Sequence, residues 1–479
     1  MNKFETIIGL EVHLQLKTKT KVFCGCANHF GREPNTQTCP VCLGLPGTLP
    51  VLNKQALFDA IKIAMALNCQ INPHIKFDRK NYYYPDLPKG YQISQHVLPI
   101  AEHGFVSVET AGQMKKIRLR RAHLEEDAGK LIHDPLINSS LVDYNRTGTP
   151  LVEMVTEPDI FSPQEAHDYL TTLKLILQYL DVSDCDMERG SLRCDANISL
   201  RAAGVKELGV KTEVKNMNSF RAVKAALEFE EQRQQKLLEA KERIIQETRL
   251  WNEEKGVTIS MRSKEESHDY RYFPEPDLVP FTVEEKILTE IKKTLPEFPK
   301  EKFERFMREH ALSEYDAKIL IGDKYLADFF ETCLKLYSQP KKICNWLSGA
   351  LLQELNARKI SIRELPLSSK NLIDLITLVE NGKISNLAGK DVLKLIIETG
   401  KTPAEIIQDK GLAQVSDESA LVKIVDDVLS ENPAVTEQVK QGKESAIGFL
   451  VGQSMKKSQG KANPKVLGEL IKRRLQNVP

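Results

Sequence analysis

The hydrophobic periodicity of the chain changes near residue 280, and this change limits the possible folds more than any other feature of the sequence. Before it, short runs alternate polar and apolar residues, and glycine and proline interrupt them often. From Glu284 onward, nearly every segment repeats its apolar residues with helical spacing. A strand changes side at each residue, whereas a helix repeats every 3.6 residues. The sequence therefore predicts an α+β region followed by an all-α region.

The length of 479 residues is too great for one hydrophobic core, so the chain should divide into two to four domains. A second change of pattern lies near Gly400 and Pro403, where short helices begin. We therefore expect three domains, over residues 1–293, 294–401 and 402–479.

Three helices are expected in the first domain from their start signals. Asn53 can cap a helix over residues 53–67, and Ser162 with Glu165 forms a capping box that opens a helix to about residue 180. Ser219 starts a long, highly charged helix that should reach roughly residue 247.

The composition is that of a globular protein with balanced charge. Lys and Arg number 67 and Asp and Glu number 66, so any contact with nucleic acid requires a local basic patch. No apolar run approaches the roughly 18 residues of a membrane span, and the first residues read as a strand instead of a signal or transit peptide. Nine cysteines suit a reducing compartment. We expect a cytoplasmic protein with no membrane contact.

The alternation in residues 7–16 points Glu11, His13 and Gln15 to one face of a strand. A solvated strand face explains this pattern, but a carboxylate and an imidazole two positions apart also suit a bound cation. Further acidic residues recur in short polar segments of the same domain, at Glu125, Glu126, Glu153, Asp195 and Glu213. Hard cations such as Mg²⁺ bind carboxylates, and phosphoryl transfer needs such ions together with basic groups. The clustering therefore favours a magnesium site for phosphoryl chemistry.

Basic residues that could bind the phosphates of ATP lie in neighbouring segments. We expect Lys80, Arg120 and Arg193 to contact the nucleotide. No Walker-type loop occurs, so the nucleotide would be bound in another way. The aromatic segments 82–84 and 270–273 could stack on a base, although packing between layers is the simpler use of such rings.

Four cysteines have the spacing of a structural zinc site. Cys24 and Cys26 are followed by Cys39 and Cys42, and thiolates so paired can share one tetrahedral Zn²⁺. Four reduced, buried cysteines are the alternative. Because protein would supply all four ligands, such an ion would leave no open position for catalysis.

The last two expected helices carry a concentration of basic residues. A solvated helix face is one explanation, and binding of tRNA phosphates is the other. The basic residues are Lys456, Lys457, Lys461, Lys465, Lys472, Arg473 and Arg474.

Five ordered motifs give the chain a resemblance to a known family. They are residues 7–13 (IIGLEVH), 77–82 (FDRKNY), 123–130 (HLEEDAGK), 190–197 (GSLRCDAN) and 269–277 (DYRYFPEPD). Together they closely resemble the B subunits of bacterial aspartyl/glutamyl-tRNA amidotransferases. Residues 452–464 also look like the tail of that family, so the resemblance covers the whole chain.

The resemblance implies a glutamine-hydrolysing carbon–nitrogen ligase (EC 6.3.5.-) that acts in translation. The B subunit of this family uses ATP to activate glutamate or aspartate mischarged on tRNA(Gln) or tRNA(Asn), and ammonia converts the acyl phosphate to the amide. An amidase (A) subunit supplies ammonia through a tunnel, and a small C subunit completes a heterotrimer. The implied architecture is a cradle-like β catalytic domain, here with a zinc knuckle at 24–42, a helical domain and a tail domain that binds tRNA.

The resemblance also implies residue roles. The metal-binding strand matches Glu11 and His13, and the acidic motif matches Glu125 and Glu126; Glu153 and Asp195 are further matching acids. We expect these six to be catalytic, and Mg²⁺ to be held by Glu11, His13, Glu126, Glu153 and Asp195. The ammonia route matches Lys80, Tyr82 and Lys89. The cysteine quartet occurs in only some members of the family, so zinc cannot be essential to the reaction.

A rival hypothesis is a non-catalytic, zinc-dependent tRNA-binding adaptor whose carboxylates only stabilise the fold. ATP hydrolysis stimulated by mischarged tRNA would separate the two, because an adaptor has no phosphoryl chemistry to stimulate.

Overall fold

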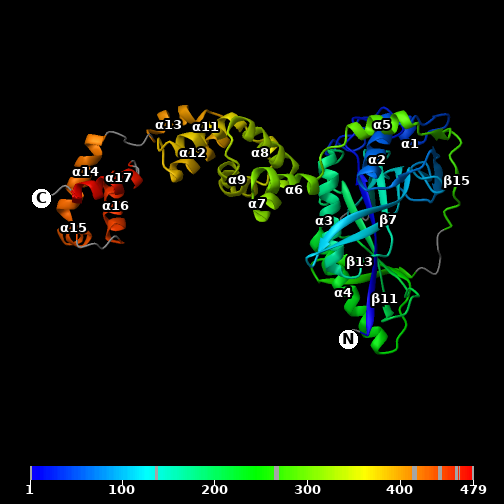
Figure 1. Cartoon of the computed structure of the whole chain (residues 1–479). Helices are drawn as coiled ribbons and strands as arrows, with labels where there is room; N and C mark the ends of the chain where they lie inside the picture. Colours follow the sequence, from blue (N-terminus) through cyan, green and yellow to red (C-terminus); the bar gives the residue numbers. More distant parts are fainter. Residues whose placement is uncertain are drawn as a thin grey trace. The chain divides into compact units, whose positions relative to one another are not determined.

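The computed structural model describes residues 3–134, 139–263, 269–412, 418–440, 445–458, 462 and 464–476. It divides into two compact units, Met1–Phe298 and Pro299–Pro479. In the described residues, strands occur only in the first unit, and the second is helical (Figure 1). The predicted α+β fold with an all-helical C-terminal region is therefore confirmed.

A nine-stranded mixed sheet forms the centre of the first unit. Its order is β14-β13-β12-β11-β1-β10-β7-β6-β2, and all neighbours are antiparallel except β12 and β13. The bounds are β1 (Phe4–Gln15), β2 (Gln70–Ile71), β6 (Ala101–Thr110), β7 (Gln113–Glu126), β10 (Pro150–Thr156), β11 (Leu192–Ala202), β12 (Thr212–Lys215), β13 (Glu247–Asn252) and β14 (Val257–Ser263).

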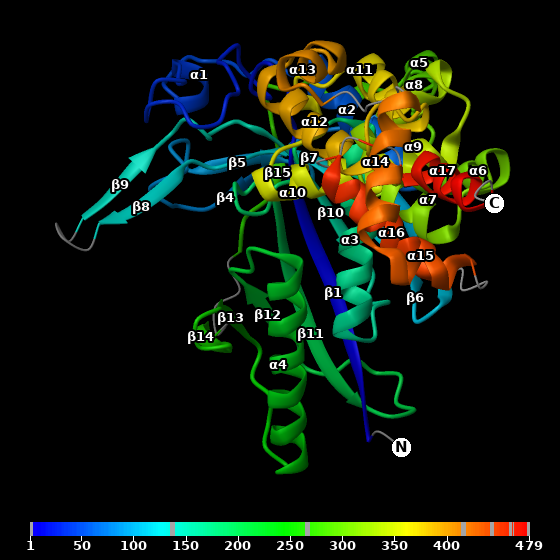
Figure 2. The ribbon, with the colours of Figure 1, turned by 90° about the vertical axis from the view of Figure 1, so that its left-hand side faces the viewer.

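Three helices cover one face of this sheet. The alternate residues Ile8, Leu10 and Val12 of β1 are buried in a core shared with helices α2 (Lys54–Ala66), α3 (Pro163–Leu180) and α4 (Phe220–Glu239). Figure 2 shows α3 and α4 beside β1 and β11, and α4 contacts β11. Because side chains alternate along a strand, the remaining residues of β1 lie on the other, open face.

The predicted helix starts are confirmed by their caps. Asn53 accepts hydrogen bonds from the amides of Gln55 and Ala56, and Ser162 accepts one from the Glu165 amide. The Glu165 carboxylate, however, accepts from the Phe161 amide at 2.8 Å instead of closing a capping box on Ser162.

The predicted end of the third helix near residue 247 is wrong. Helix α4 ends at Glu239, Lys241 has a left-handed φ of 59°, and Glu247 begins β13. Helix-forming residues continue past Glu239, but the pairing of β13 with β12 and β14 determines the local structure.

Smaller elements surround the open face. A three-stranded sheet has the order β15 (Phe273–Pro274), β4 (Asp78–Asn81), β5 (Tyr91–Ser94). A hairpin pairs β8 (Lys130–Asp134) with β9 (Ser139–Asp143), and β3 (His74–Ile75) pairs with β16 (Phe281–Thr282). The short helix α1 (Pro40–Leu43) follows the third cysteine, and α5 (Glu285–Lys293) ends the unit.

The second unit contains two separate apolar cores. Its helices are α6 (Pro299–His310), α7 (Glu314–Ile321), α8 (Lys324–Leu336), α9 (Pro340–Trp346), a π-helix (Leu347–Leu351), α10 (Leu352–Arg358), a 3₁₀ turn (Ile362–Glu364), α11 (Ser369–Glu380), α12 (Asn386–Thr399), α13 (Pro403–Lys410), α14 (Glu418–Glu431), α15 (Pro433–Lys440), α16 (Ser445–Lys457) and α17 (Pro464–Gln476). One core extends to Ile406 of α13, and the other joins α14, α16 and α17. The expected division into three domains remains a prediction. Among the described residues, no helix has the length and apolar character needed to cross a membrane.

Candidate functional site

The open face of the sheet gathers polar residues from five neighbouring strands. His13 on β1 stands opposite Glu153 on β10, and Glu153 stands opposite His123 on β7. On the other side of β1, Glu11 stands opposite Asp195 on β11. The antiparallel register therefore brings together residues that are more than 100 positions apart in the sequence.

His13, Glu125 and Glu153 form a compact group that fits a divalent cation. One ligand atom from each lies within 4.8 Å of the others. The His13 Nε2 atom is 3.7 Å from a Glu153 oxygen and 3.9 Å from a Glu125 oxygen. These distances are too long for hydrogen bonds. They fall in the range of about 3.0 to 4.2 Å expected between two ligands of one octahedral ion with bonds of about 2.1 Å.

His123, Ser94 and Lys80 surround this group. His123 Nε2 is 3.1 Å from a Glu153 oxygen and 3.5 Å from a Glu125 oxygen, and the Ser94 hydroxyl donates to Glu125 at 3.0 Å. Burial by itself would raise the pKa of both carboxyl groups, but His123 lowers each pKa below its ordinary value. Burial opposes the charged form of Lys80, yet Glu125 raises the pKa of its ammonium group. The site therefore holds two carboxylates beside a protonated lysine.

Glu11 belongs to a second acidic group on the same face. Burial, followed by repulsion from Glu153 and Glu213, raises the pKa of Glu11. Its carboxylate accepts a hydrogen bond from Asn197 at 3.0 Å. Lys215 pairs with Asp195 at 2.6 Å and with Glu213 at 3.2 Å, so an ammonium group partly offsets the acids.

Glu126 points away from the cation group. Alternation along β7 places it on the side of the sheet opposite Glu125, where its carboxylate accepts from the Ile93 amide at 2.9 Å and forms an ion pair with Lys89. Glu126 and Lys89 line a cavity of about 100 Å³ that Cys24 and Cys42 also border. The expected role of Glu126 as a magnesium ligand remains a prediction.

The three residues expected on the ammonia route lie around these two glutamates. The Lys80 ammonium is 5.8 Å from the ring centre of Tyr82 and 4.9 Å from that of Tyr270. Burial, together with repulsion from Glu125, raises the pKa of Tyr82, so its hydroxyl stays protonated. Lys80 and Tyr82 are thus near Glu125, and Lys89 holds Glu126 on the other side of β7.

The nucleotide candidates Arg120 and Arg193 have different surroundings. Arg120 lines a pocket of about 300 Å³ together with Glu11 and Asn197. Arg193 donates to the buried carboxylate of Asp127 at 3.0 Å. Arg120 is therefore the better placed of the two for a phosphate beside Glu11.

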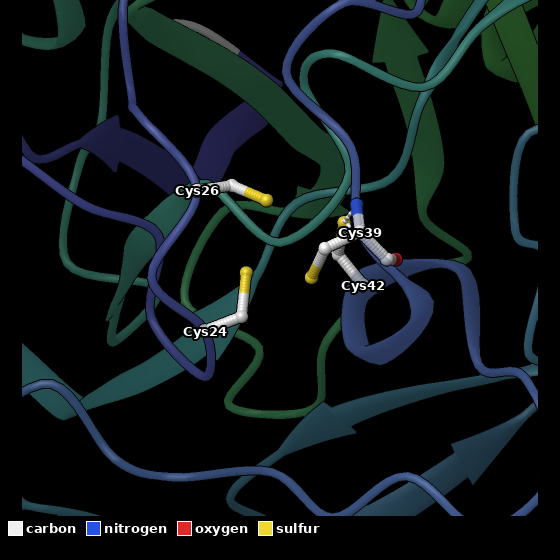
Figure 3. Close-up of side chains that lie close together, drawn as sticks. All are labelled: Cys24, Cys26, Cys39 and Cys42. Atoms are coloured by element: carbon white, nitrogen blue, oxygen red, sulfur yellow. Dashed lines mark hydrogen bonds between the residues drawn. The ribbon is translucent and has the colours of Figure 1, made fainter.

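Cys24, Cys26, Cys39 and Cys42 converge on one point, as the four-cysteine spacing predicts. Their sulfur atoms point toward a common space in Figure 3, and all lie within 4.8 Å of one another. A tetrahedral zinc site with bonds of about 2.3 Å requires sulfur atoms about 3.8 Å apart, so the group fits this ion. The fully buried Lys21 lies with its ammonium 3.7 Å from the Cys42 sulfur, where it offsets thiolate charge.

Sequence reasoning did not assign roles to His123 and Lys215. Each lies two positions from an assigned acid on the same strand, His123 from Glu125 and Lys215 from Glu213. The two-residue period was the available signal, because it places each pair on one face.

The basic residues of the tail are partly neutralised within the tail itself. Lys457 forms an ion pair with Glu431 at 2.6 Å, and Arg474 forms one with Asp426 at 2.6 Å. Lys456 and Arg473 are exposed. Lys461 lies outside the described residues, as does the side chain of Lys465. The binding of these basic residues to tRNA remains a prediction.

Comparison with known proteins identifies the class of this fold and site. Residues 6–289 match the family described as the GatB/GatE catalytic domain, and residues 328–475 match the GatB domain. Three relatives are named as B subunits of aspartyl/glutamyl-tRNA(Asn/Gln) amidotransferases. Those from Thermoanaerobacter sp. (strain X514) and Thermodesulfovibrio yellowstonii are each 54% identical, over 473 and 469 residues, and the alignments cover 99% and 98% of both chains. The relative from Caldicellulosiruptor bescii is 49% identical over 479 residues, which is 99% of this chain and 100% of that protein.

The chain belongs to the family of aspartyl/glutamyl-tRNA(Asn/Gln) amidotransferase B subunits. The resemblance expected from the sequence motifs is therefore confirmed.

Proposed function

We propose that this chain uses ATP to activate the side-chain carboxyl of glutamate or aspartate on mischarged tRNA(Gln) or tRNA(Asn), and then amidates it. A carboxylate oxygen attacks the γ-phosphorus of ATP, the bond to ADP breaks, and an acyl phosphate forms. Ammonia then attacks the carbonyl carbon, phosphate leaves, and a proton is lost to give the amide. The observation that carries the proposal is the group of His13, Glu125 and Glu153 beside the Lys80 ammonium on an open sheet face.

The residues around this group have distinct tasks. His13, Glu125 and Glu153 would hold Mg²⁺, which would offset phosphate charge during transfer. Lys80 remains protonated beside them and can bind an oxygen of the transferred phosphoryl group. Arg120 shares a pocket with Glu11 and is placed to bind another phosphate.

The cavity behind Glu126 supports an ammonia path on the other side of β7. Lys89, Glu126 and Tyr91 line it, and Tyr82 is buried near both glutamates. An enclosed path keeps ammonia unprotonated and protects the acyl phosphate from water. An amidase subunit would supply the ammonia, and a small third subunit would complete the assembly, as the family name of the relatives suggests.

The four cysteines would hold one structural Zn²⁺, since all four ligands come from the chain. The ion would fix the loop of residues 24–42 and take no part in phosphoryl transfer.

Matched substitutions of the two adjacent glutamates test the proposal in the complex reconstituted with its partner subunits. Glu125→Gln should abolish ATP hydrolysis stimulated by mischarged tRNA, because it removes a charged ligand beside the reacting phosphate. Glu126→Gln should leave the partner's glutaminase active but reduce amidation with glutamine as the ammonia source. If the wild-type complex binds mischarged tRNA without hydrolysing ATP, the chain is an adaptor and the proposal is wrong.

A further inference from the structure

A large pocket adjoins the proposed active site, and the function described so far does not use it. Its volume is about 570 Å³. Its walls come from the loop between Cys26 and Cys39, from the β8–β9 hairpin and from the segment just before β11. We call it the Phe30 pocket, and its main lining residues are Gln15, Asn28, Phe30, Arg32, Lys130 and Arg189.

The Phe30 ring is exposed although the loop that carries it is firmly attached. The side chain of Phe30 is 76% exposed. On one side of it, Asn28 donates to the carbonyl groups of Leu16 and Thr18 at 3.0 and 3.3 Å. On the other side, Asn35 donates to the Val142 carbonyl at 3.0 Å. A large aromatic ring that is held in water by a well-anchored loop is available to a ligand, because little ordering entropy is lost on binding.

The charge around the ring is positive. Five basic side chains line the pocket, against three acidic ones at Asp143, Asp184 and Glu188. The Arg189 guanidinium lies 6.0 Å from the centre of the Phe30 ring. Exposed aromatic rings interleaved with cationic side chains are the usual means of binding single-stranded nucleic acid, since bases stack on the rings and phosphates contact the cations. The near-neutral charge of the whole chain makes this local excess more informative.

The pocket is placed close to the proposed reaction site. Gln15 lines it and lies two residues from His13 on the same face of β1. Two residues of a strand span about 6.8 Å. An amino acid esterified to the terminal ribose could therefore reach the cation group while the last nucleotides remain in the pocket.

We propose that the Phe30 pocket binds the single-stranded 3′ end of the aminoacyl-tRNA, with a base stacked on Phe30. This inference rests on the proposed function, because it places the substrate of that reaction.

The test measures the affinity of the reconstituted complex for two RNA minihelices. One ends in the single-stranded 3′ nucleotides of tRNA, and the other has the same stem and a blunt end. Phe30→Ala should weaken binding of the first by roughly 5- to 150-fold, the effect of losing one stacked base, and leave binding of the blunt stem unchanged. Phe30→Trp should restore the affinity. Phe161→Ala is the matched control, because Phe161 is also exposed at 48% with the Lys115 ammonium 4.0 Å from its ring centre, but it lies outside the pocket.

Each outcome decides between explanations. Equal affinity of wild type and Phe30→Ala for the minihelix with the single-stranded end would overturn the inference, while the amidation assay on the same complex separately tests the proposed function. Loss of subunit assembly in Phe30→Ala, measured by size-exclusion chromatography, would instead assign the pocket to a protein partner and would also overturn it.

Discussion

Replacing Gly44 by alanine should destabilise the first unit through a side chain that is 45 positions away in the sequence. Gly44 ends α1 with a left-handed φ of 68°, and a Cβ atom built there would lie 2.2 Å from Cγ of Lys89. The Lys89 stem cannot move freely, since its ammonium group pairs with the buried Glu126. The left-handed backbone should cost about 1 to 2 kcal/mol, and the overpacking about 1 to 3 kcal/mol more.

A double-mutant cycle isolates the contact between the two residues. In a Lys89→Ala background the Cγ and Cδ atoms are absent, so Gly44→Ala should cost only the backbone part, about 1 to 2 kcal/mol. Gly47→Ala is the matched control, because Gly47 has a φ of 84° but no atom within 4 Å of an added Cβ. The assay is urea unfolding of all the variants, and the expected coupling is about 1 to 3 kcal/mol. Additive costs, within about 0.5 kcal/mol, would refute the reasoning that Gly44 makes room for Lys89.

Three other outcomes are expected. Replacing Cys39 and Cys42 by serine should remove one equivalent of zinc and lower the melting temperature, and elemental analysis of wild-type protein prepared without chelator must find that zinc for the site to stand. Burial opposes ionisation of Asp127, but Arg193 and Arg146 lower its pKa below the ordinary value, so its contribution to stability is full above about pH 4 and is lost as the pH falls through the folded-state pKa. Asp127→Asn should therefore flatten the acid side of the stability profile measured by urea unfolding between pH 7 and 3. Deleting residues 413–479 should weaken tRNA binding and reduce the slope of log affinity against log salt by about 0.7 to 0.9 for each phosphate that the tail neutralises, whereas an unchanged slope would exclude the tail from the interface.

The sequence predicted strand faces better than it predicted the partners of those faces. Alternation placed Glu11 and His13 on one side of β1, and the structure has them there. The same rule predicts opposite sides for Glu125 and Glu126, although the family motif groups them together. By contrast, the position of Glu153 opposite His13 depends on antiparallel register, which is set by packing of the whole sheet and has no local signal.

The cysteine group illustrates a site that spacing can predict, because its four ligands lie within 19 positions and the ion itself defines their arrangement. The Phe30 pocket illustrates the reverse. Its walls come from three separate segments, and only the folded chain brings Phe30 close to Arg189. The end of α4 was predicted wrongly for a similar reason, since the strand that follows it is stabilised by distant partners.

The opposite orientations of Glu125 and Glu126 restrict how this protein can change during evolution. One carboxylate faces the cation group and the other faces the cavity, and only the pleat of β7 separates the two. Deleting or inserting a single residue in β7 before these positions would reverse both side chains at once, removing a ligand from one side and the partner of Lys89 from the other. Point substitutions elsewhere in β7 can be neutral, but changes in its length between the bulge beside Thr156 and Glu126 should be eliminated by selection.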